Sequence, residues 1–205
     1  MPINTDNVPF VFTTEFIDTK DARRCLNALV DRHDVLRSNI VYRSGVPMQE
    51  INSGTKYDII TVVADDCIHG QKSLLVGQLC GTPFDLNAGP WARFGFVQHP
   101  GKRTVLVVVI HHIACDAQSS RILAAEWAAL CNAATCTDDC IVGGELCEAA
   151  GLQARRLKFS DYTIRHRELL EFVSGPQQNY WRKRLGDSGT AVSLVKSHVL
   201  PYSIK

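Results

Sequence analysis

The sequence lacks an excess of charge of either sign, and it lacks a hydrophobic run long enough to cross a membrane. Its 205 residues carry 22 basic and 21 acidic side chains, for a net charge of +1. Proteins that bind nucleic acids or membrane surfaces usually show a basic excess, so this balance argues against both partners. No run approaches the roughly 20 apolar residues of a membrane span, and the first residues do not resemble a secretory signal. We therefore expect a globular cytoplasmic protein.

The sequence also lacks the cysteine spacings that are typical of a zinc site. None of its eight cysteines forms a CxxC pair, and the group at positions 131, 136, 140 and 147 is not followed by histidine at zinc-finger spacing. Disulfides are rare in a reducing compartment. We expect free thiols, with no metal and no cofactor.

What the sequence does contain is an alternation of strand and helix patterns. β-branched and aromatic runs predict strands at 8–16, 39–42, 48–51, 57–63, 91–98 and 104–110. Apolar residues at helical spacing predict a helix capped by Asp18 or Thr19, and further helices at 67–79, 118–131, 159–172 and 176–185. Residues 132–150 are predicted to be a surface loop and residues 187–205 an irregular tail. Trp91, Trp127 and Trp181 are expected in the core. The pattern predicts one α/β (α+β) domain over residues 1–205.

One stretch places reactive side chains at the end of a buried strand. The unbroken apolar run at 105–110 is typical of a strand covered on both faces. It leads directly into His111 and His112, and Asp116 follows four residues later. Histidine titrates near neutral pH and is a natural general base. The spacing leaves a second interpretation open, because paired histidines can satisfy backbone groups at a strand end and Asp116 fits the N-cap of the next helix.

The cysteine inside this stretch suggests two other chemistries. Cys115 is a candidate nucleophile, but no dedicated base accompanies it, so we favour a supporting role. With His111 and His112 it is also a candidate metal ligand. The HxH and HxxxH spacings of common metal sites are absent, and we expect no metal here.

The stretch resembles the HHxxxD active-site motif of condensation domains of nonribosomal peptide synthetases, which belong to the chloramphenicol acetyltransferase-like superfamily. Other segments resemble further motifs of that family in the same order: RHDVLR at 32–37, GVPMQ at 45–49, FDLNAGPWAR at 84–93, FSDY at 159–162 and YWRKRL at 180–185. The resemblance implies a single lobe of that fold, a two-layer sandwich with a mixed β-sheet packed with helices.

The resemblance also implies roles for the residues of the motif. His112 corresponds to the catalytic histidine and would act as general base, whereas His111 would be structural. Asp116 would hold the loop through an ion pair with an arginine, for which Arg37 and Arg32 are the candidates. The backbone N–H that follows Asp116 would face the reacting oxygen.

Positions that depart from the family pattern, or that belong to other motifs, carry further expectations. Ala117 stands where the family motif ends in glycine, so its Cβ is expected to narrow the substrate channel or to restrict the backbone. His33 is expected to be a packing residue rather than a second base. The basic side chains at 155, 156, 158, 165 and 167 are expected to form a solvated face or to meet an acidic carrier protein.

The resemblance covers only the first of the two lobes of a condensation domain. It implies an enzyme of secondary metabolism that acts on a small-molecule or carrier-protein-bound thioester, by acyl transfer that forms an amide or ester, or by intramolecular cyclisation. Two alternatives stay open. The chain is a half-enzyme completed by homodimerisation or by a separate second lobe, or it is a non-catalytic module that docks on a synthetase or carrier protein.

Overall fold

A computed structural model describes residues 6–15, 17–54, 57, 59–63, 68–98 and 103–186 of the chain. The chain divides into two compact units, residues 1–160 and residues 161–205, and the single domain expected over residues 1–205 stays a prediction. The described part of the second unit is most of α5 (Phe159–Leu185), which buries none of its side chains. The apolar residues of α5 are therefore spaced like those of a core-facing helix, but they do not lie in a core. Trp91 and Trp127 are buried as predicted, but Trp181 in α5 is 55% exposed.

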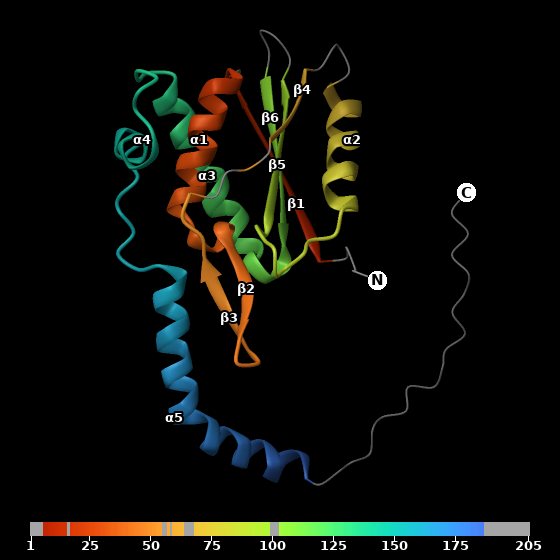
Figure 1. Cartoon of the computed structure of the whole chain (residues 1–205), viewed down its shortest axis with the longest axis vertical. Helices are drawn as coiled ribbons and strands as arrows, with labels where there is room; N and C mark the ends of the chain where they lie inside the picture. Colours follow the sequence, from red (N-terminus) through yellow and green to blue (C-terminus); the bar gives the residue numbers. More distant parts are fainter. Residues whose placement is uncertain are drawn as a thin grey trace, which may run out of the picture. The chain divides into compact units, whose positions relative to one another are not determined.

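The first unit is built on a four-stranded mixed sheet in the order β1-β6-β5-β4 (Figure 1). β1 (Asn7–Glu15) pairs antiparallel with β6 (Arg103–His111), and β6 pairs antiparallel with β5 (Ala92–Gln98). β4 (Ile59–Val63) lies parallel to β5 at the edge. The strand that carries the histidine pair at its end is therefore central in the sheet.

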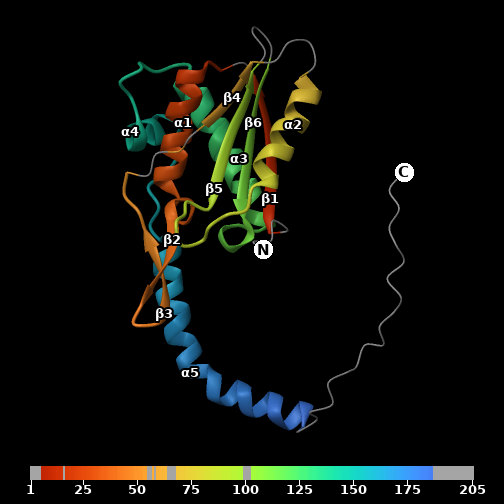
Figure 2. The ribbon, with the colours of Figure 1, turned by 45° about the vertical axis from the view of Figure 1, so that its right-hand side comes forward.

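Helices cover both faces of this sheet, which explains the unbroken apolar run of β6. Leu106, Val108 and Ile110 pack with α1 (Thr19–Arg32) and α3 (Ala117–Ala134). The alternate residues at 105, 107 and 109 pack with α2 (Ile68–Gly81) on the other face (Figure 2). The predicted α/β class with a mixed sheet is confirmed, and α2 adds a layer to the two that were expected.

Local signals placed the first helix and the hairpin correctly. Asp18 caps α1, because its carboxylate accepts a hydrogen bond from the backbone N–H of Asp21 at 2.8 Å. The 3-10 helix η1 (Asp34–Arg37) then leads into a hairpin of β2 (Ser38–Arg43) and β3 (Val46–Ile51). Ser44 and Gly45 form its turn with φ angles of 53° and 79°, as a tight two-residue hairpin requires.

The region predicted as a surface loop contains a buried helix. α3 continues to Ala134, and α4 (Gly143–Ala149) forms within residues 132–150. Leu146 is fully buried in the same core as α1 and α3. The many Gly, Asp and Cys residues hid this helix, because a seven-residue helix gives too short an apolar pattern to recognise without its packing partners.

Residues 159–185 form one helix where the sequence predicted two. α5 runs through Pro176 without interruption, and Figures 1 and 2 show it bending along its length. Proline in a helix removes one backbone donor and crowds the preceding turn, so that the helix kinks or breaks there, and α5 continues past Pro176. The predicted tail at 187–205 lies outside the described residues. None of the described helices is long and apolar enough to span a bilayer.

Candidate functional site

The end of β6 fixes the backbone of the histidine pair. His111 is the last residue of β6, and His112 begins the short 3-10 helix η2 (His112–Ala114). The N–H of His111 donates to the carbonyl oxygen of Trp91 at 3.0 Å, and the N–H of His112 donates to that of Asp6 at 2.8 Å. The two histidines are thus displayed from a rigid strand end.

The two imidazoles have different surroundings. Nδ1 of His111 accepts a hydrogen bond from the backbone N–H of Ile113 at 3.1 Å, and its ring lies edge-on to Phe84 at 6.0 Å. This geometry suits the structural role expected of His111. The side chain of His112, in contrast, is exposed, and its ring nitrogens are available to an outside molecule.

Asp116 caps the helix that follows the histidines. Its Oδ1 accepts hydrogen bonds from the N–H of Ser119 at 2.9 Å and from the Ser119 hydroxyl at 2.8 Å. Oγ of Ser119 in turn accepts from the N–H of Asp116 at 3.1 Å, which completes a capping box. The hydrogen bonds from Ser119 lower the pKa of Asp116 below its usual value. Asp116 therefore fixes the start of α3 as an anion.

The expected ion pair between Asp116 and an arginine is wrong for the described residues. Nη1 of Arg37 donates to the carbonyl oxygen of Asn52 at 2.9 Å. Nε of Arg32 lies 3.1 Å from Oε1 of Glu126. Both guanidinium groups are thus committed elsewhere, and the carboxylate of Asp116 is committed to the N-terminus of α3.

Ala117 does not strain the loop. It is the first residue of α3, and among the described non-glycine residues only Ser44 has a positive φ. No positive φ therefore requires glycine at this position, and the expected backbone restriction stays a prediction. The expected narrowing of a substrate channel by the Cβ of Ala117 stays a prediction.

Two substitutions at Asp116 separate capping from ion pairing. We expect Asp116→Ala to lower the melting temperature by a few degrees, because α3 loses its N-cap. Asp116→Asn keeps an acceptor oxygen and is expected to melt close to wild type at neutral pH. The folded-state pKa is lowered, so the carboxylate's contribution is present above its unfolded pKa and is lost as pH falls through the folded pKa. Thermal unfolding at pH 7 checks the pair, and an equal loss in both variants would contradict the capping role.

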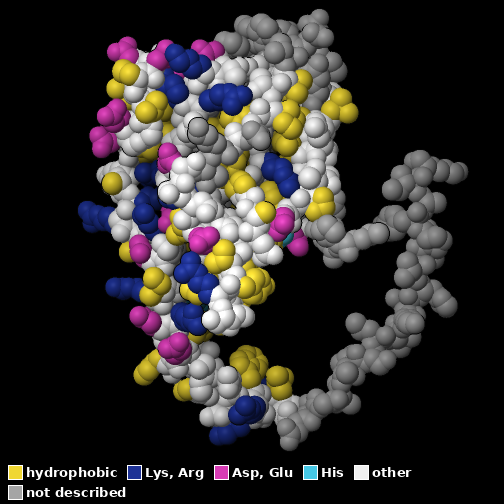
Figure 3. Space-filling model, viewed as in Figure 1, with side chains coloured by type: hydrophobic (Ala, Val, Ile, Leu, Met, Phe, Trp, Pro, Cys, Tyr) yellow, Lys and Arg dark blue, Asp and Glu magenta, His cyan; other side chains and the backbone are white. Residues whose placement is uncertain are grey.

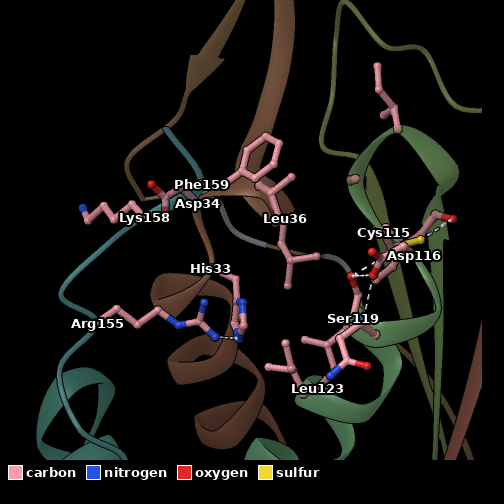
Figure 4. Close-up of a pocket in the computed structure, with 16 residues that line it drawn as sticks. His33, Asp34, Leu36, Cys115, Asp116, Ser119, Leu123, Arg155, Lys158 and Phe159 are labelled. Carbon is pink, nitrogen blue, oxygen red and sulfur yellow. Dashed lines mark hydrogen bonds between the residues drawn. The ribbon is translucent and has the colours of Figure 1, made fainter. Parts of the chain in front are cut away.

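A pocket of about 450 Å³ opens beside the motif (Figure 4). One wall comes from the end of α1 and from η1, the opposite wall from η2 and the first turns of α3, and a third from the segment that precedes α5. The lining residues include His33, Leu36, Cys115, Ser119, Leu123 and Arg155. The loop of the motif therefore forms one side of a cavity large enough for a small molecule.

Cys115 lines this pocket but is poorly suited to nucleophilic attack. Burial and, to a smaller extent, the nearby Asp116 carboxylate raise the pKa of its thiol to about 11. The reactive thiolate is therefore scarce at neutral pH, in keeping with the supporting role expected of Cys115. No group of three or more His, Cys, Asp or Glu residues that could hold a metal ion occurs in the described part of the chain.

A buried charge cluster behind the pocket was missed from the sequence. Glu126 of α3 has a side chain only 11% exposed. Its Oε2 lies 2.7 Å from Nε2 of His33, and its Oε1 lies 3.1 Å from Arg32 and 3.0 Å from Arg155. Burial raises the pKa of Glu126, but the hydrogen bonds from His33 and Arg155 and the nearby Arg32 guanidinium lower it to about 2. The carboxylate is therefore ionised and ties together three segments of the chain.

The cluster adds to two expectations from the sequence. Arg155 was expected on a solvated basic face, and it is exposed but also donates to Glu126 at 3.0 Å. His33 was expected to be a packing residue rather than a second base, and its ring also hydrogen-bonds to Glu126. The sequence could have indicated that Glu126 is buried. Glu126 follows the buried Leu123 by three positions and so belongs to the core-facing stripe of α3.

Comparison with known proteins gives consistent matches along the chain. The family model described as Condensation domain matches residues 6–202. Tyrocidine synthase 2 of Brevibacillus parabrevis is 28% identical over 195 residues, which are 92% of this chain and 5% of that protein. Bacitracin synthase 2 of Bacillus licheniformis is 30% identical over 125 residues, 60% of this chain and 5% of that protein.

Solved structures show the same fold. A structure described as the basis for condensation domain-mediated chain release from the enacyloxin polyketide synthase matches with a TM-score of 0.69 at 21% identity, over 89% of this chain and 34% of that one. The X-domain from teicoplanin biosynthesis matches with a TM-score of 0.66 at 21% identity, over 88% of this chain and 38% of that one. The present chain thus spans a small part of its curated relatives and little more than a third of these structures.

Proposed function

The chain belongs to the Condensation domain family, and we propose that it catalyses acyl transfer from a thioester, with His112 as the general base. The single observation that carries the proposal is the position of His112. It is exposed at the rigid end of a central strand, while its neighbour His111 is occupied within the loop. An accessible imidazole on a fixed backbone is what proton removal from an incoming nucleophile requires.

The proposed reaction consumes a thioester and an amine or alcohol. The nucleophile attacks the thioester carbonyl as His112 accepts its proton, and a new C–N or C–O bond forms. The C–S bond then breaks, and the proton passes from His112 to the leaving thiolate, so that no other reactant is needed. The N–H of Ala117, at the N-terminus of α3, is the proposed donor to the oxyanion.

An intramolecular version uses the same proton transfer. When the amine or hydroxyl and the acyl group belong to one small molecule, attack closes a ring rather than joining two molecules. The base, the capped helix and the accessible loop are unchanged in this case. We propose cyclisation as the alternative outcome of the same site.

The reaction class is tested with a small acyl thioester and a primary amine. The native chain is incubated with both, and amide formation is followed by mass spectrometry together with release of the free thiol. We expect both products at a rate above that of the heat-unfolded protein. Thiol release without amide would indicate hydrolysis, and neither product above background would contradict acyl transfer by this chain alone.

A second candidate is a half-enzyme that needs a further polypeptide, either a second copy of this chain or a separate lobe. The observation that favours it is the surface of α5. Large apolar side chains are exposed along this helix (Figure 3), including Ile164, Leu169, Phe172, Tyr180 and Trp181. None of the side chains of α5 is buried, and exposed apolar side chains in this number are typical of a surface that a partner covers.

Sedimentation velocity over a range of concentrations tests this second candidate. Self-association that is abolished by the double variant Leu169→Glu and Phe172→Glu, but not by a charge added at the already polar Gln177, would indicate a second copy. A monomer at all concentrations would leave a separate lobe as the required partner. Amide formation by that monomer would contradict the half-enzyme altogether.

A further inference from the structure

His33 combines a carboxylate partner with a place in the pocket wall. Its Nε2 lies 2.7 Å from Oε2 of Glu126, and its side chain is 9% exposed. The same residue lines the 450 Å³ pocket, across from Ser119 and Leu123 of α3 (Figure 4). An imidazole held by a buried carboxylate on one edge presents its other edge in a fixed direction.

The charge on Glu126 decides which ring nitrogen carries the hydrogen. A carboxylate only accepts hydrogen bonds, so Nε2 must donate in the 2.7 Å contact with Glu126. Nη2 of Arg155 lies 3.2 Å from the same Nε2, but it cannot donate to a nitrogen that already holds a hydrogen. Arg155 donates instead to Oε1 of Glu126 at 3.0 Å. In the neutral ring, Nδ1 is therefore left as a bare acceptor.

Nδ1 of His33 has no hydrogen-bond partner among the described residues. It is also absent from the described side-chain atoms that are sealed from solvent without a partner. Nδ1 is thus neither paired nor sealed, and the His33 side chain lines the cavity while being only 9% exposed. We infer that a molecule in the cavity can reach this atom. When the His33 ring is neutral, the pocket wall therefore carries a directed acceptor at Nδ1, in addition to the carboxylates of Asp34 and Asp116.

The rest of the lining defines the kind of molecule that fits. Much of it is apolar, with Leu36, Ile110, Ile122, Leu123 and Phe159 among its members. The charged side chains at and behind this lining balance, with three cations and three carboxylates: Arg32, Arg155, Lys158, Asp34, Asp116 and Glu126. Neither a cationic nor an anionic ligand is favoured by an excess of the opposite charge. A neutral apolar body with one hydroxyl matches both features.

We propose that this pocket is a binding site for a neutral, largely apolar small molecule that carries a hydroxyl group, and that the hydroxyl donates a hydrogen bond to Nδ1 of His33. The proposal does not depend on catalysis by His112. It concerns binding alone, and a chain without acyl-transfer activity would still show it.

Two probes that differ in one hydrogen-bond donor test the site. 4-Propylphenol carries the hydroxyl, and 4-propylanisole has the same body without a donor. We expect 4-propylphenol to bind the wild-type chain with a Kd on the order of 1 mM, typical for so small a ligand, and roughly 5- to 10-fold more tightly than the anisole. Long-range ¹H–¹⁵N NMR of the histidine rings is expected to show a shift of Nδ1 of His33 with the phenol only.

The variant His33→Gln separates the pocket role from the structural role. Its side-chain amide can still donate to Glu126, but it places no acceptor at the position of Nδ1. We expect it to melt close to wild type and to bind the two probes equally. If the variant does not fold, the Nδ1 shift in the wild-type chain decides. Equal affinity of both probes for the wild type, or a phenol that leaves Nδ1 unshifted, would overturn the proposal.

Discussion

Alanine in place of His112 is expected to lower the rate of acyl transfer by about 100- to 10,000-fold, the usual contribution of a positioned general base. The side chain is exposed, so its removal leaves no cavity and should not alter the melting temperature. The loss would then reflect chemistry rather than folding. Amide formation from the small acyl thioester measures the rate, with circular dichroism as the check on folding.

His166→Ala is the matched control for this prediction. His166 is also an exposed histidine, but it lies on α5, stacked on Tyr162 at 5.3 Å. It takes no part in the proposed reaction, and we expect its replacement to leave the rate within twofold of wild type. A similar fall in both variants, or a rate that survives in His112→Ala, would rule out His112 as the base.

Removing the carboxylate of Glu126 is expected to cost about 3–5 kcal/mol of stability, as for other buried ion pairs that lose one partner. Glu126→Ala leaves Arg32, whose side chain is 13% exposed, without its counter-charge. It also releases Arg155 from the wall of the pocket. Urea unfolding of the variant and of wild type measures the difference.

Glu50→Gln provides the comparison for this loss. Glu50 forms an ion pair with Arg43 in which the side chains are 41% and 69% exposed. Exposed pairs contribute about 0–1 kcal/mol, so this variant should unfold near the wild-type midpoint. Equal losses at both positions would show that the buried cluster does not hold the segments together.

The charge cluster around Glu126 is also expected to make the folded state less stable at acidic pH. The pKa of Glu126 is lowered from its usual value of 4.5 to about 2 in the folded state. A lowered folded-state pKa stabilises the fold above the unfolded pKa, and this contribution disappears as pH falls from about 4.5 towards 2. Glu126→Gln, which cannot ionise, is expected to lose less stability than wild type across this window. An equally steep loss in Glu126→Gln would assign the acid sensitivity to other groups.

The elements that were predicted correctly carry their signals within a few residues. Asp18 caps α1, and Ser44 with Gly45 turns the hairpin, because each acts on the backbone beside it. The unbroken apolar run of β6 indicated a strand covered on both faces, which the structure confirms. The same local chemistry correctly offered Asp116 as a helix cap.

The features that were missed depend on contacts between distant parts of the chain. Leu146 is in the core only because α4 packs on α1, and nothing in its own neighbourhood of Gly, Glu and Cys indicates this. Glu126 contacts His33, which is 93 positions away in the sequence, and no local sequence pattern predicts this contact. The arginine partner for Asp116 was taken from a resemblance, and it failed because Arg32 and Arg37 have nearer acceptors.

The most direct test of the central claim compares metabolites from three strains of a producing host: one with the wild-type gene, one with His112→Ala and one with the gene deleted. The His112→Ala protein is first shown to accumulate and fold as wild type. We predict that its strain matches the deletion, with the same product missing and the same precursor accumulating, and that the precursor carries the acyl group or nucleophile consumed. Wild-type levels of product in the His112→Ala strain would contradict the account and point to a docking role for the chain.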